Sequence, residues 1–257
     1  MLLLVDAGNT RVKWALADSP QTADMPGRWH ASGTVLREQV VELGDAWRGA
    51  RIARAIVSNV AGPTMRDCIE RALLRALGTV PVPVEWFASV PALAGVRNAY
   101  RVPALLGCDR FASAIGAHAL YPGTALIVAT CGTATTIDAL TADGVFLGGM
   151  ILPGLGLMAA SLARSTAQLP QVEERIVLPQ PFADNTHDAI VSGCIAAQVG
   201  AIERAFAAHR QQHRAARCIL SGGAAEIIAP YLSMPVERVD NLVLIGLHTA
   251  ALKHTPC

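Results

Sequence analysis

The sequence predicts a layered α/β fold made of two similar halves. Short aliphatic segments alternate along the chain with longer stretches rich in Ala, Leu and Arg, which is the pattern of strands followed by helices. The first strand and its turn also recur in the middle of the chain. The 257 residues are 52% hydrophobic and only 5% aromatic, which is typical of a globular α/β protein.

Local patterns place the expected elements. Short segments that are aliphatic or alternating, and that are bounded by Gly, Asn, Asp or Pro, predict strands. These strands are 2–6, 11–17, 52–58, 125–130, 134–140, 144–151 and 217–220. Helical spacing of apolar residues predicts helices over 36–49, 64–77, 110–120, 155–164, 187–213 and 245–253.

An internal echo indicates a duplication. The segment LLVDAGNTRVKWAL, which begins at Leu3, aligns without a gap to IVATCGTATTIDAL, which begins at Ile127. Gly8 then falls on Gly132. Each half therefore opens with a strand, a tight glycine turn and a returning strand.

The echo also divides the chain into two domains. We expect the boundary within 115–124, where HALYPGT breaks a helix before the second copy of the strand. The N-terminal domain would cover 1–118 and carry the first turn. The C-terminal domain would cover 119–257 and carry the second turn.

Charge and cysteine usage narrow the function classes. The formal net charge is +1 and the arginines are scattered, so we expect neither nucleic acid nor an anionic membrane as a partner. No apolar run reaches the roughly eighteen residues of a membrane span. MLLLVDAG is typical of a first strand rather than a signal peptide. The six cysteines form no CxxC pair, which favours reduced thiols and a cytoplasmic location.

The first turn has the residues of a phosphate site. Gly8 permits positive φ and lets a ligand approach the backbone, while Asn9 and Thr10 offer polar donors. Lys13 on the returning strand can reach a phosphate, and Asp6 can hold Mg²⁺ that bridges to phosphate oxygens. The alternative is a plain hairpin turn that begins with an Asp.

The second turn, TCGTATT, again combines a glycine with hydroxyl side chains. Gly132 and Thr133 form its tip. Two such tips can hold a phosphate chain between two domains, and this differs from a Walker P-loop because no GxxxxGK[ST] is present. The series Gly154-x-Gly156-x-x-Ala159 resembles a dinucleotide fingerprint. Its late position and the preceding Pro153 argue against that interpretation.

An acid at a helix start is the candidate general base. Asp109 lies in GCDR, which opens an Ala-rich helix. A carboxylate in the first turn of a helix is stabilised by the helix dipole, and the spacing alone favours that structural role. The functional alternative is a base that takes a proton from a substrate hydroxyl, with Arg110 beside it binding a carboxylate or a phosphoryl group.

Five motifs in order resemble the type III pantothenate kinases, which belong to the acetate and sugar kinase, Hsp70 and actin superfamily. The motifs are DAGNTRVK, NAYRVPALLGCDR, CGTATTID, GGMILPG and NTHDAIVSG. The resemblance implies two RNase H-like domains with the actin-like ATPase fold, with ATP bound between them. It also implies a homodimer whose pantothenate pocket is partly built by the neighbouring subunit.

The resemblance implies roles for particular residues. Asp109 matches the family's catalytic base for the primary hydroxyl of pantothenate. The residues that match pantothenate-contacting positions are Tyr100, Gly107, Asp109, Arg110 and Thr186. The residues implied in binding the phosphates of ATP are Asp6, Gly8, Asn9, Thr10, Lys13, Gly132 and Thr133. LSGGAA resembles the glycine pair on the adenosine side.

One position departs from the family. Thr130 stands where many members have an acid that ligates a monovalent cation, so a K⁺ or NH₄⁺ site is in doubt here.

His187 follows an Asn-Thr pair that is typical of a helix cap, and we expect it to be a helix-start residue rather than a catalyst.

We therefore predict ATP-dependent phosphorylation of pantothenate to 4′-phosphopantothenate, the first step of coenzyme A biosynthesis. One alternative is a superfamily kinase for another small hydroxyl compound. The other is a nucleotide-binding regulatory protein without catalytic activity.

Overall fold

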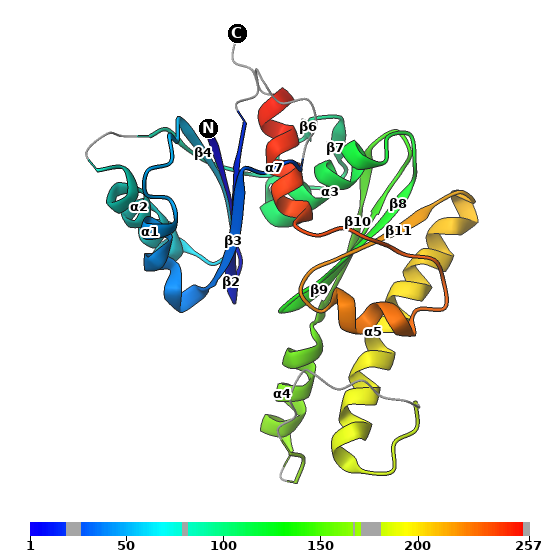
Figure 1. The fold of residues 1–257 in the computed structure, drawn as a ribbon. Coiled ribbons are helices and arrows are strands. Elements are labelled where there is room, and N and C mark those ends of the chain that lie inside the picture. Colours follow the sequence, from blue (N-terminus) through cyan, green and yellow to red (C-terminus); the bar gives the residue numbers. More distant parts are fainter. Residues whose placement is uncertain (19–26, 79–81, 167, 171–180, 254–257) are drawn as a thin grey trace. The chain divides into compact units, whose positions relative to one another are not determined.

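The structure is a computed structural model that describes residues 1–18, 27–78, 82–166, 168–170 and 181–253. It forms two compact units (Figure 1). The first contains Met1–Pro122, Gly144–Phe146 and Asn241–Cys257, and the second contains Gly123–Asp143 and Leu147–Asp240. Each unit is described by itself below.

A five-stranded sheet in the order β3-β2-β1-β4-β5 forms the centre of the first unit. The strands are β1 (Leu2–Ala7), β2 (Arg11–Ala17), β3 (Ala31–Leu36), β4 (Arg54–Asn59) and β5 (Val84–Trp86). β2 is antiparallel to β1 and β3, whereas β4 is parallel to β1 and β5. The carboxyl ends of β1 and β4 therefore lie next to each other.

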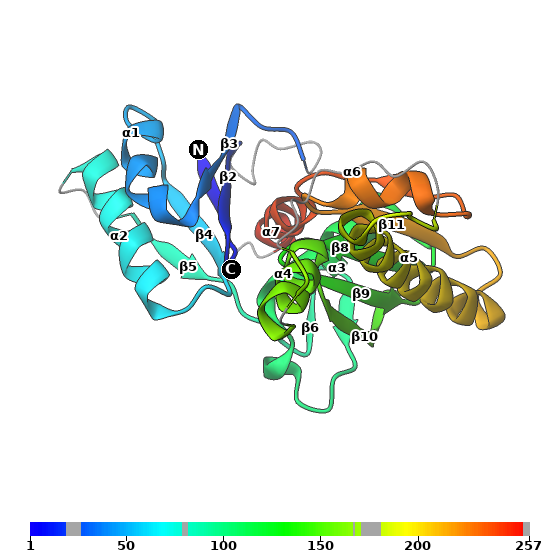
Figure 2. The ribbon, with the colours of Figure 1, turned by 90° about the horizontal axis from the view of Figure 1, so that it is seen from below.

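Alternation along β1 gives the sheet two buried faces. Leu3 and Val5 join the core that also holds the fully buried Trp47. The helices on this side are α1 (Leu43–Ala46) and α2 (Pro63–Leu77), which Figure 2 shows together on one face. Leu4 and Asp6 point to the opposite face, because side chains alternate along a strand.

Two helices pack on that opposite face. They are α3 (Cys108–Leu120), which contacts β4, and α7 (Leu242–Lys253), which contacts β1 and β4. α3 and α7 approach each other through glycines: a Cβ on Gly246 would lie 1.8 Å from the Ala112 oxygen. A Cβ on Gly116 would lie 2.6 Å from the Leu242 oxygen. Only glycine at these positions permits so close a contact.

The sheet of the second unit repeats the order of the first. Its strands run β12-β11-β8-β9-β10. Their bounds are β8 (Leu126–Cys131), β9 (Ala134–Leu140), β10 (Val145–Pro153), β11 (Arg217–Ser221) and β12 (Glu237–Arg238). β8 is antiparallel to β9 and parallel to β11, as β1 is to β2 and β4. Val145 and Phe146 at the start of β10 also pair with β7 (Val96–Asn98), which pairs in turn with β6 (Ala92–Leu93).

Helices α4 (Leu155–Ser165) and α5 (Thr186–Gln212) connect β10 to β11, and α6 (Ala225–Ile228) follows β11. Ile195, Ile202 and Phe206 of α5 lie in the core of this unit. α5 is long and apolar enough to cross a bilayer, but half of its apolar window is buried inside the structure. A core helix of a globular domain has these same properties.

Most of the predicted elements are present, with ends that differ by at most three residues. One prediction is wrong: 36–49 is not a single helix but the end of β3, the 3₁₀ helix η1 (Arg37–Glu42) and the short α1. The sequence did not predict β3, β5, β6, β7 or β12, or the 3₁₀ helices η2 (Pro103–Leu105) and η3 (Ala229–Tyr231). These elements are too short, or too exposed on one side, to produce a clear apolar period.

The predicted domains 1–118 and 119–257 stay a prediction. The two compact units group residues that contact one another, and this grouping does not test whether the chain consists of two duplicated halves. The five described cysteines, Cys68, Cys108, Cys131, Cys194 and Cys218, are free thiols. Cys257 lies outside the described residues.

Candidate functional site

The first unit gathers three polar side chains at one end of its sheet, where β1 and β4 end and β2 begins. Asp6 is directly opposite Lys13 across the β1–β2 hairpin, and Ser58 of β4 is the partner of Asp6 on the other side. Residues that are opposite in a sheet point to the same face. All three therefore face the side on which α3 and α7 pack.

The carboxyl group of Asp6 is electrostatically unusual. Its pKa is raised from 3.8 to about 7: burial is the largest cause, the negative charge of Asp109 adds to the rise, and the Lys13 ammonium opposes it. Desolvation and a like charge both disfavour the ionised form. The two carboxyl groups thus share one site, in which a bound cation would relieve their repulsion.

The start of α3 fixes Asp109 near this site. The Asp109 Oδ1 accepts a 2.8 Å hydrogen bond from the Arg110 backbone N–H. A Cβ on Gly107 would lie 2.8 Å from the same oxygen, so glycine leaves room for the carboxylate. Burial raises the pKa of Asp109, while the backbone N–H and the charge of Arg110 oppose that shift. A raised pKa makes the carboxylate a better proton acceptor.

Two weaker contacts join the first turn of α3 to β4. The Cys108 Sγ lies 3.4 Å from the Ser58 Oγ and 3.7 Å from the Asn59 carbonyl oxygen, to which the thiol can donate. Burial raises the pKa of the Cys108 thiol, with Asp109 adding to the shift. The thiol therefore acts as a packing group rather than a nucleophile.

A buried arginine follows Asp109 in α3 and contacts a tyrosine of the loop before that helix. Arg110 is only 7% exposed, and its Nη1 donates a 2.8 Å hydrogen bond to the Tyr100 hydroxyl. Its guanidinium also lies 5.7 Å from the ring centres of Tyr100 and Phe146. Asn98 holds the preceding loop, because its side chain accepts from the Tyr100 N–H and donates to the Pro103 oxygen.

Gly8 does not use the positive φ that a glycine permits at the first turn. Gly8 instead closes the hairpin tightly: its N–H donates to the Arg11 oxygen over 3.1 Å, and a Cβ would approach that oxygen to 3.1 Å. Asn9 and Thr10 follow at the exposed tip.

The second turn is one residue shorter than the first. The Gly132 N–H donates to the Ala134 oxygen, two residues ahead, whereas Gly8 bonds three residues ahead. Thr130 consequently pairs with Thr136, where a gapless echo would require Ile137. The echo therefore holds along β8 but slips by one residue on the returning strand, and the second turn has no counterpart of Lys13.

Thr130 occupies the place of Asp6 in the second unit, with Ser221 of β11 beside it as Ser58 lies beside Asp6. Its Oγ1 is buried and has no hydrogen-bond partner. A buried hydroxyl without a partner is unusual, and a neutral oxygen can complete the coordination of a cation. No group of three or more His, Cys, Asp or Glu gathers as a metal centre among the residues that the structure describes.

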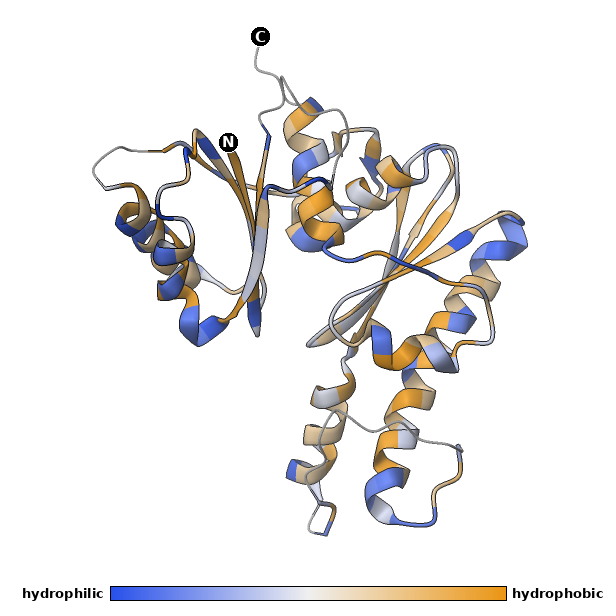
Figure 3. Cartoon of the chain, viewed as in Figure 1, coloured by the Kyte–Doolittle hydropathy of each residue, from blue (hydrophilic) through white to orange (hydrophobic). Residues whose placement is uncertain are grey.

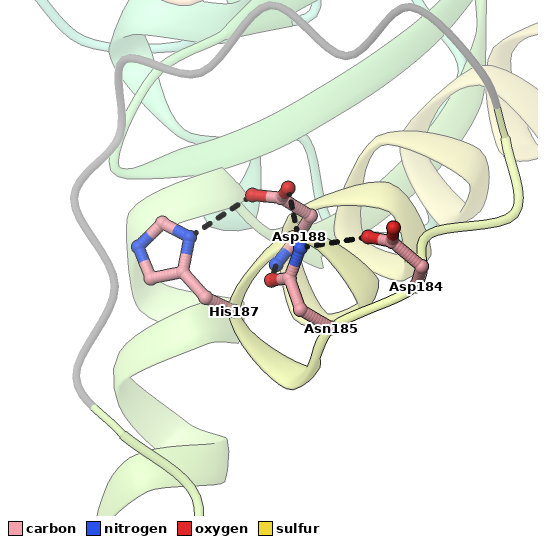
Figure 4. A network of polar contacts seen from close by, with 4 residues as sticks. All are labelled: Asp184, Asn185, His187 and Asp188. Atoms are coloured by element: carbon pink, nitrogen blue, oxygen red, sulfur yellow. Dashed lines mark hydrogen bonds and ion pairs between the residues drawn. The ribbon is translucent and has the colours of Figure 1, made fainter.

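Thr186 is the first residue of α5, in the second unit. The cap before it is Asn185, whose side chain accepts a 2.9 Å hydrogen bond from the Asp188 N–H (Figure 4). His187 contacts Asp188 at 3.2 Å, and the interactions of Asn185 and His187 lower the pKa of Asp188. The predicted helix cap is confirmed.

The structure thus brings Asp6, Lys13 and Asp109 together. Arg110 follows Asp109 in the first turn of α3, and Tyr100 lies in the loop before that helix. The structure adds Ser58, Asn98 and Phe146, which the sequence did not single out. Ser58 ends an aliphatic run, and only the parallel register of β4 reveals its neighbour. Two carboxylates, one ammonium and a buried guanidinium are suited to binding a cation and anionic groups and to accepting a proton.

Comparisons with known proteins agree with this chemistry. A family model described as type III pantothenate kinase matches residues 2–208. A type III pantothenate kinase of Janthinobacterium sp. (strain Marseille) is 62% identical over 100% of this chain and 99% of its own length. One from Herminiimonas arsenicoxydans is 59% identical over the same shares.

A solved structure also has a similar fold. A candidate 2-dehydro-3-deoxygalactonokinase from Sinorhizobium meliloti aligns over 98% of both chains with a TM-score of 0.60 and 14% identity. The predicted fold class, α/β with two RNase H-like units of the actin-like ATPase type, is confirmed by this likeness and by the repeated strand order.

Proposed function

The chain belongs to the type III pantothenate kinase family, and on that premise we propose that it transfers the γ-phosphoryl group of ATP to the primary hydroxyl of pantothenate. The observation that carries the proposal is the grouping of Asp6, Lys13 and Asp109 on one face of the first sheet. The product is 4′-phosphopantothenate, which enters coenzyme A biosynthesis.

Asp109 is the proposed catalytic base. Its carboxylate takes the proton of the pantothenate hydroxyl as the hydroxyl oxygen attacks the γ-phosphorus and ADP leaves. Burial, which raises the pKa of Asp109, increases its proton affinity. Positioning and charge stabilisation contribute most of the rate enhancement in such reactions, and proton transfer is a smaller part.

Asp6 is the proposed Mg²⁺ ligand. A half-buried carboxylate beside a second one fits a divalent cation, since Mg²⁺ is usually held by one or two carboxylates together with substrate phosphates. When bound, Mg²⁺ neutralises charge on the phosphates. Lys13 and the turn Gly8-Asn9-Thr10 would hold phosphate oxygens, and Gly132 and Thr133 would hold them from the second unit.

The acceptor would be bound by groups around the start of α3. The Arg110 guanidinium, fixed by the Tyr100 hydroxyl, suits the carboxylate of pantothenate. Gly107 leaves space beside Asp109 for the reacting hydroxyl. Thr186, at the start of α5, is the remaining proposed contact.

A monovalent cation is the least supported cofactor. Thr130 supplies one unpartnered neutral oxygen and no charge. We propose that activity depends little on K⁺ or NH₄⁺, because an uncharged ligand binds a cation weakly in competition with water.

A second copy of this chain is the proposed partner. Leu147 and Ile151 on β10 and Leu157 on α4 are 48%, 65% and 42% exposed. Figure 3 shows α4 coloured largely as hydrophobic. Apolar residues gathered on one strand and the next helix are typical of a protein interface. We expect Ile151→Asp to reduce the dimer fraction in sedimentation analysis, and an unchanged distribution between monomer and dimer would argue against this face.

We propose the cytoplasm as the compartment and no membrane or nucleic acid partner.

The central experiment is phosphorylation of pantothenate by the purified protein with ATP and Mg²⁺, with and without K⁺ or NH₄⁺. We expect turnover in both salts. The Asp109→Asn variant should stay folded and bind ATP but lose about 100-fold or more in turnover, the usual size of a general-base contribution. Near-normal turnover of that variant would remove Asp109 from the role. Phosphorylation of a sugar, with none of pantothenate, would favour the alternative kinase, and ATP binding without turnover would favour the regulator.

A further inference from the structure

The second turn is held from one side by the residue just before α4, Gly154. The Gly154 N–H donates a 2.9 Å hydrogen bond to the Thr133 oxygen. A Cβ on Gly154 would lie 2.0 Å from the Gly132 oxygen and 2.7 Å from the Thr133 oxygen. Real Cβ atoms do not approach backbone so closely, so any side chain at position 154 would displace the turn.

The loop after β11 contacts the turn through another glycine. Gly222 has φ +94°, and a Cβ there would lie 2.3 Å from the Cys131 oxygen. The Ala224 N–H donates a 3.0 Å hydrogen bond to that same oxygen. Positive φ and close approach both require glycine at this position.

These contacts fall on three consecutive carbonyl groups, those of Cys131, Gly132 and Thr133. A peptide unit is planar, so fixing a carbonyl also fixes the N–H group of the next residue. The Gly132 N–H is held within the turn by the Ala134 oxygen. The contacts behind the turn therefore set the directions of the N–H groups of Thr133 and Ala134. Successive backbone N–H groups in a turn form an anion site only when their directions converge.

We infer that Gly154 and Gly222 are positioning residues that aim the backbone of the Gly132–Thr133 turn at a phosphate group of the nucleotide. This rests on the proposed function, in which the turn holds phosphate oxygens. Neither glycine needs to touch the nucleotide, since each acts through the carbonyl groups that it contacts. The inference also gives a role to Gly154, the first glycine of the series that resembles a dinucleotide fingerprint.

The test is Gly154→Ala, with Gly193→Ala as the matched control. Gly193 lies exposed on α5, and a Cβ there would meet nothing within 4 Å. ADP binding is measured by calorimetry, and KM for ATP and for pantothenate by turnover. We expect Gly154→Ala to weaken ADP binding by about ten- to a hundred-fold and to raise KM for ATP similarly, as for a misplaced binding group. KM for pantothenate should change less than about twofold.

Equal ADP affinity in wild type and Gly154→Ala would overturn the inference, as would equal rises in both KM values. ADP binding needs no acceptor, so a wild type that binds ADP without phosphorylating pantothenate would refute the proposed function and leave this test intact. If Gly154→Ala does not fold, amide hydrogen exchange of the wild type decides. We expect the amides of Gly154 and Ala224, which donate to the carbonyl groups of the turn, to be protected before ADP is added. Fast exchange of these two amides would overturn the inference.

Discussion

Replacing Asp6 by Asn should stabilise the ligand-free protein while abolishing its proposed metal binding. Asn has nearly the same shape but does not ionise. In the wild type, burial and the charge of Asp109 raise the pKa of Asp6 from 3.8 to about 7. Between these two values the folded state binds more protons than the unfolded state, so wild-type stability falls as the pH rises. The stability of the Asn variant does not fall in this way, because Asn does not ionise.

The magnitude follows from the shift. Each pKa unit corresponds to about 1.36 kcal/mol, so a shift from 3.8 to about 7 costs at most roughly 4 kcal/mol once the carboxyl is ionised in both states. Roughly a third of this cost is already present at pH 5. Water that reaches the half-buried carboxylate reduces the rest, so we expect the stability gap between variant and wild type to widen by about 1–3 kcal/mol from pH 5 to pH 8.

The assay is urea unfolding at pH 5 and pH 8, in EDTA and without nucleotide. Glu203→Gln is the control, because hydrogen bonds from Ser233 lower the pKa of Glu203 rather than raise it. The stabilisation from Glu203 is lost only as the pH falls through its folded pKa, so the stability gap of this variant should be nearly the same at pH 5 and pH 8. A gap for Asp6→Asn that stays constant or narrows with rising pH would refute the reasoning.

Two further substitutions test the packing and capping described above. Gly246→Ala places a Cβ 1.8 Å from the Ala112 oxygen, and we expect a loss of about 1–3 kcal/mol or more in urea unfolding. Gly200→Ala on α5, where a Cβ would meet nothing within 4 Å, should instead gain up to about 1 kcal/mol, and equal effects of the two would contradict the α3–α7 contact. Asn185→Ala removes the bond to the Asp188 N–H and should cost about 1 kcal/mol in thermal unfolding, so an unchanged melting temperature would show that the cap is dispensable.

The sequence predicted the two hairpins well because both of their signals are local. Aliphatic alternation indicated the strands, and a glycine with polar neighbours indicated each turn, so the bounds 11–17 and 134–140 match β2 and β9. Turn length is different, since it depends on which carbonyl the glycine N–H reaches. Gly8 reaches Arg11, and Gly132 reaches Ala134. No residue pattern distinguishes these two closures.

Contacts between segments that are distant along the chain also could not be predicted from the sequence. Periodicity predicted helices close to α3 and α7, but it does not say which helices pack together. The close approach depends on Gly116 and Gly246, which in the sequence are only two of 22 glycines. Ser58 was missed for the same reason: its place beside Asp6 comes from strand register.

The packing of α7 on α3 has a consequence for the order in which the chain folds. The first sheet is complete after β5, yet the face that carries Asp6 is covered partly by Leu242–Lys253, which is made after every strand of both sheets. Until then that face exposes apolar strand residues such as Leu4 to water. Such late closure slows folding, because contacts between distant segments must wait for the intervening chain. The proposed catalytic face is therefore completed only after the second sheet has been made, although the strands that carry it are among the first to be synthesised.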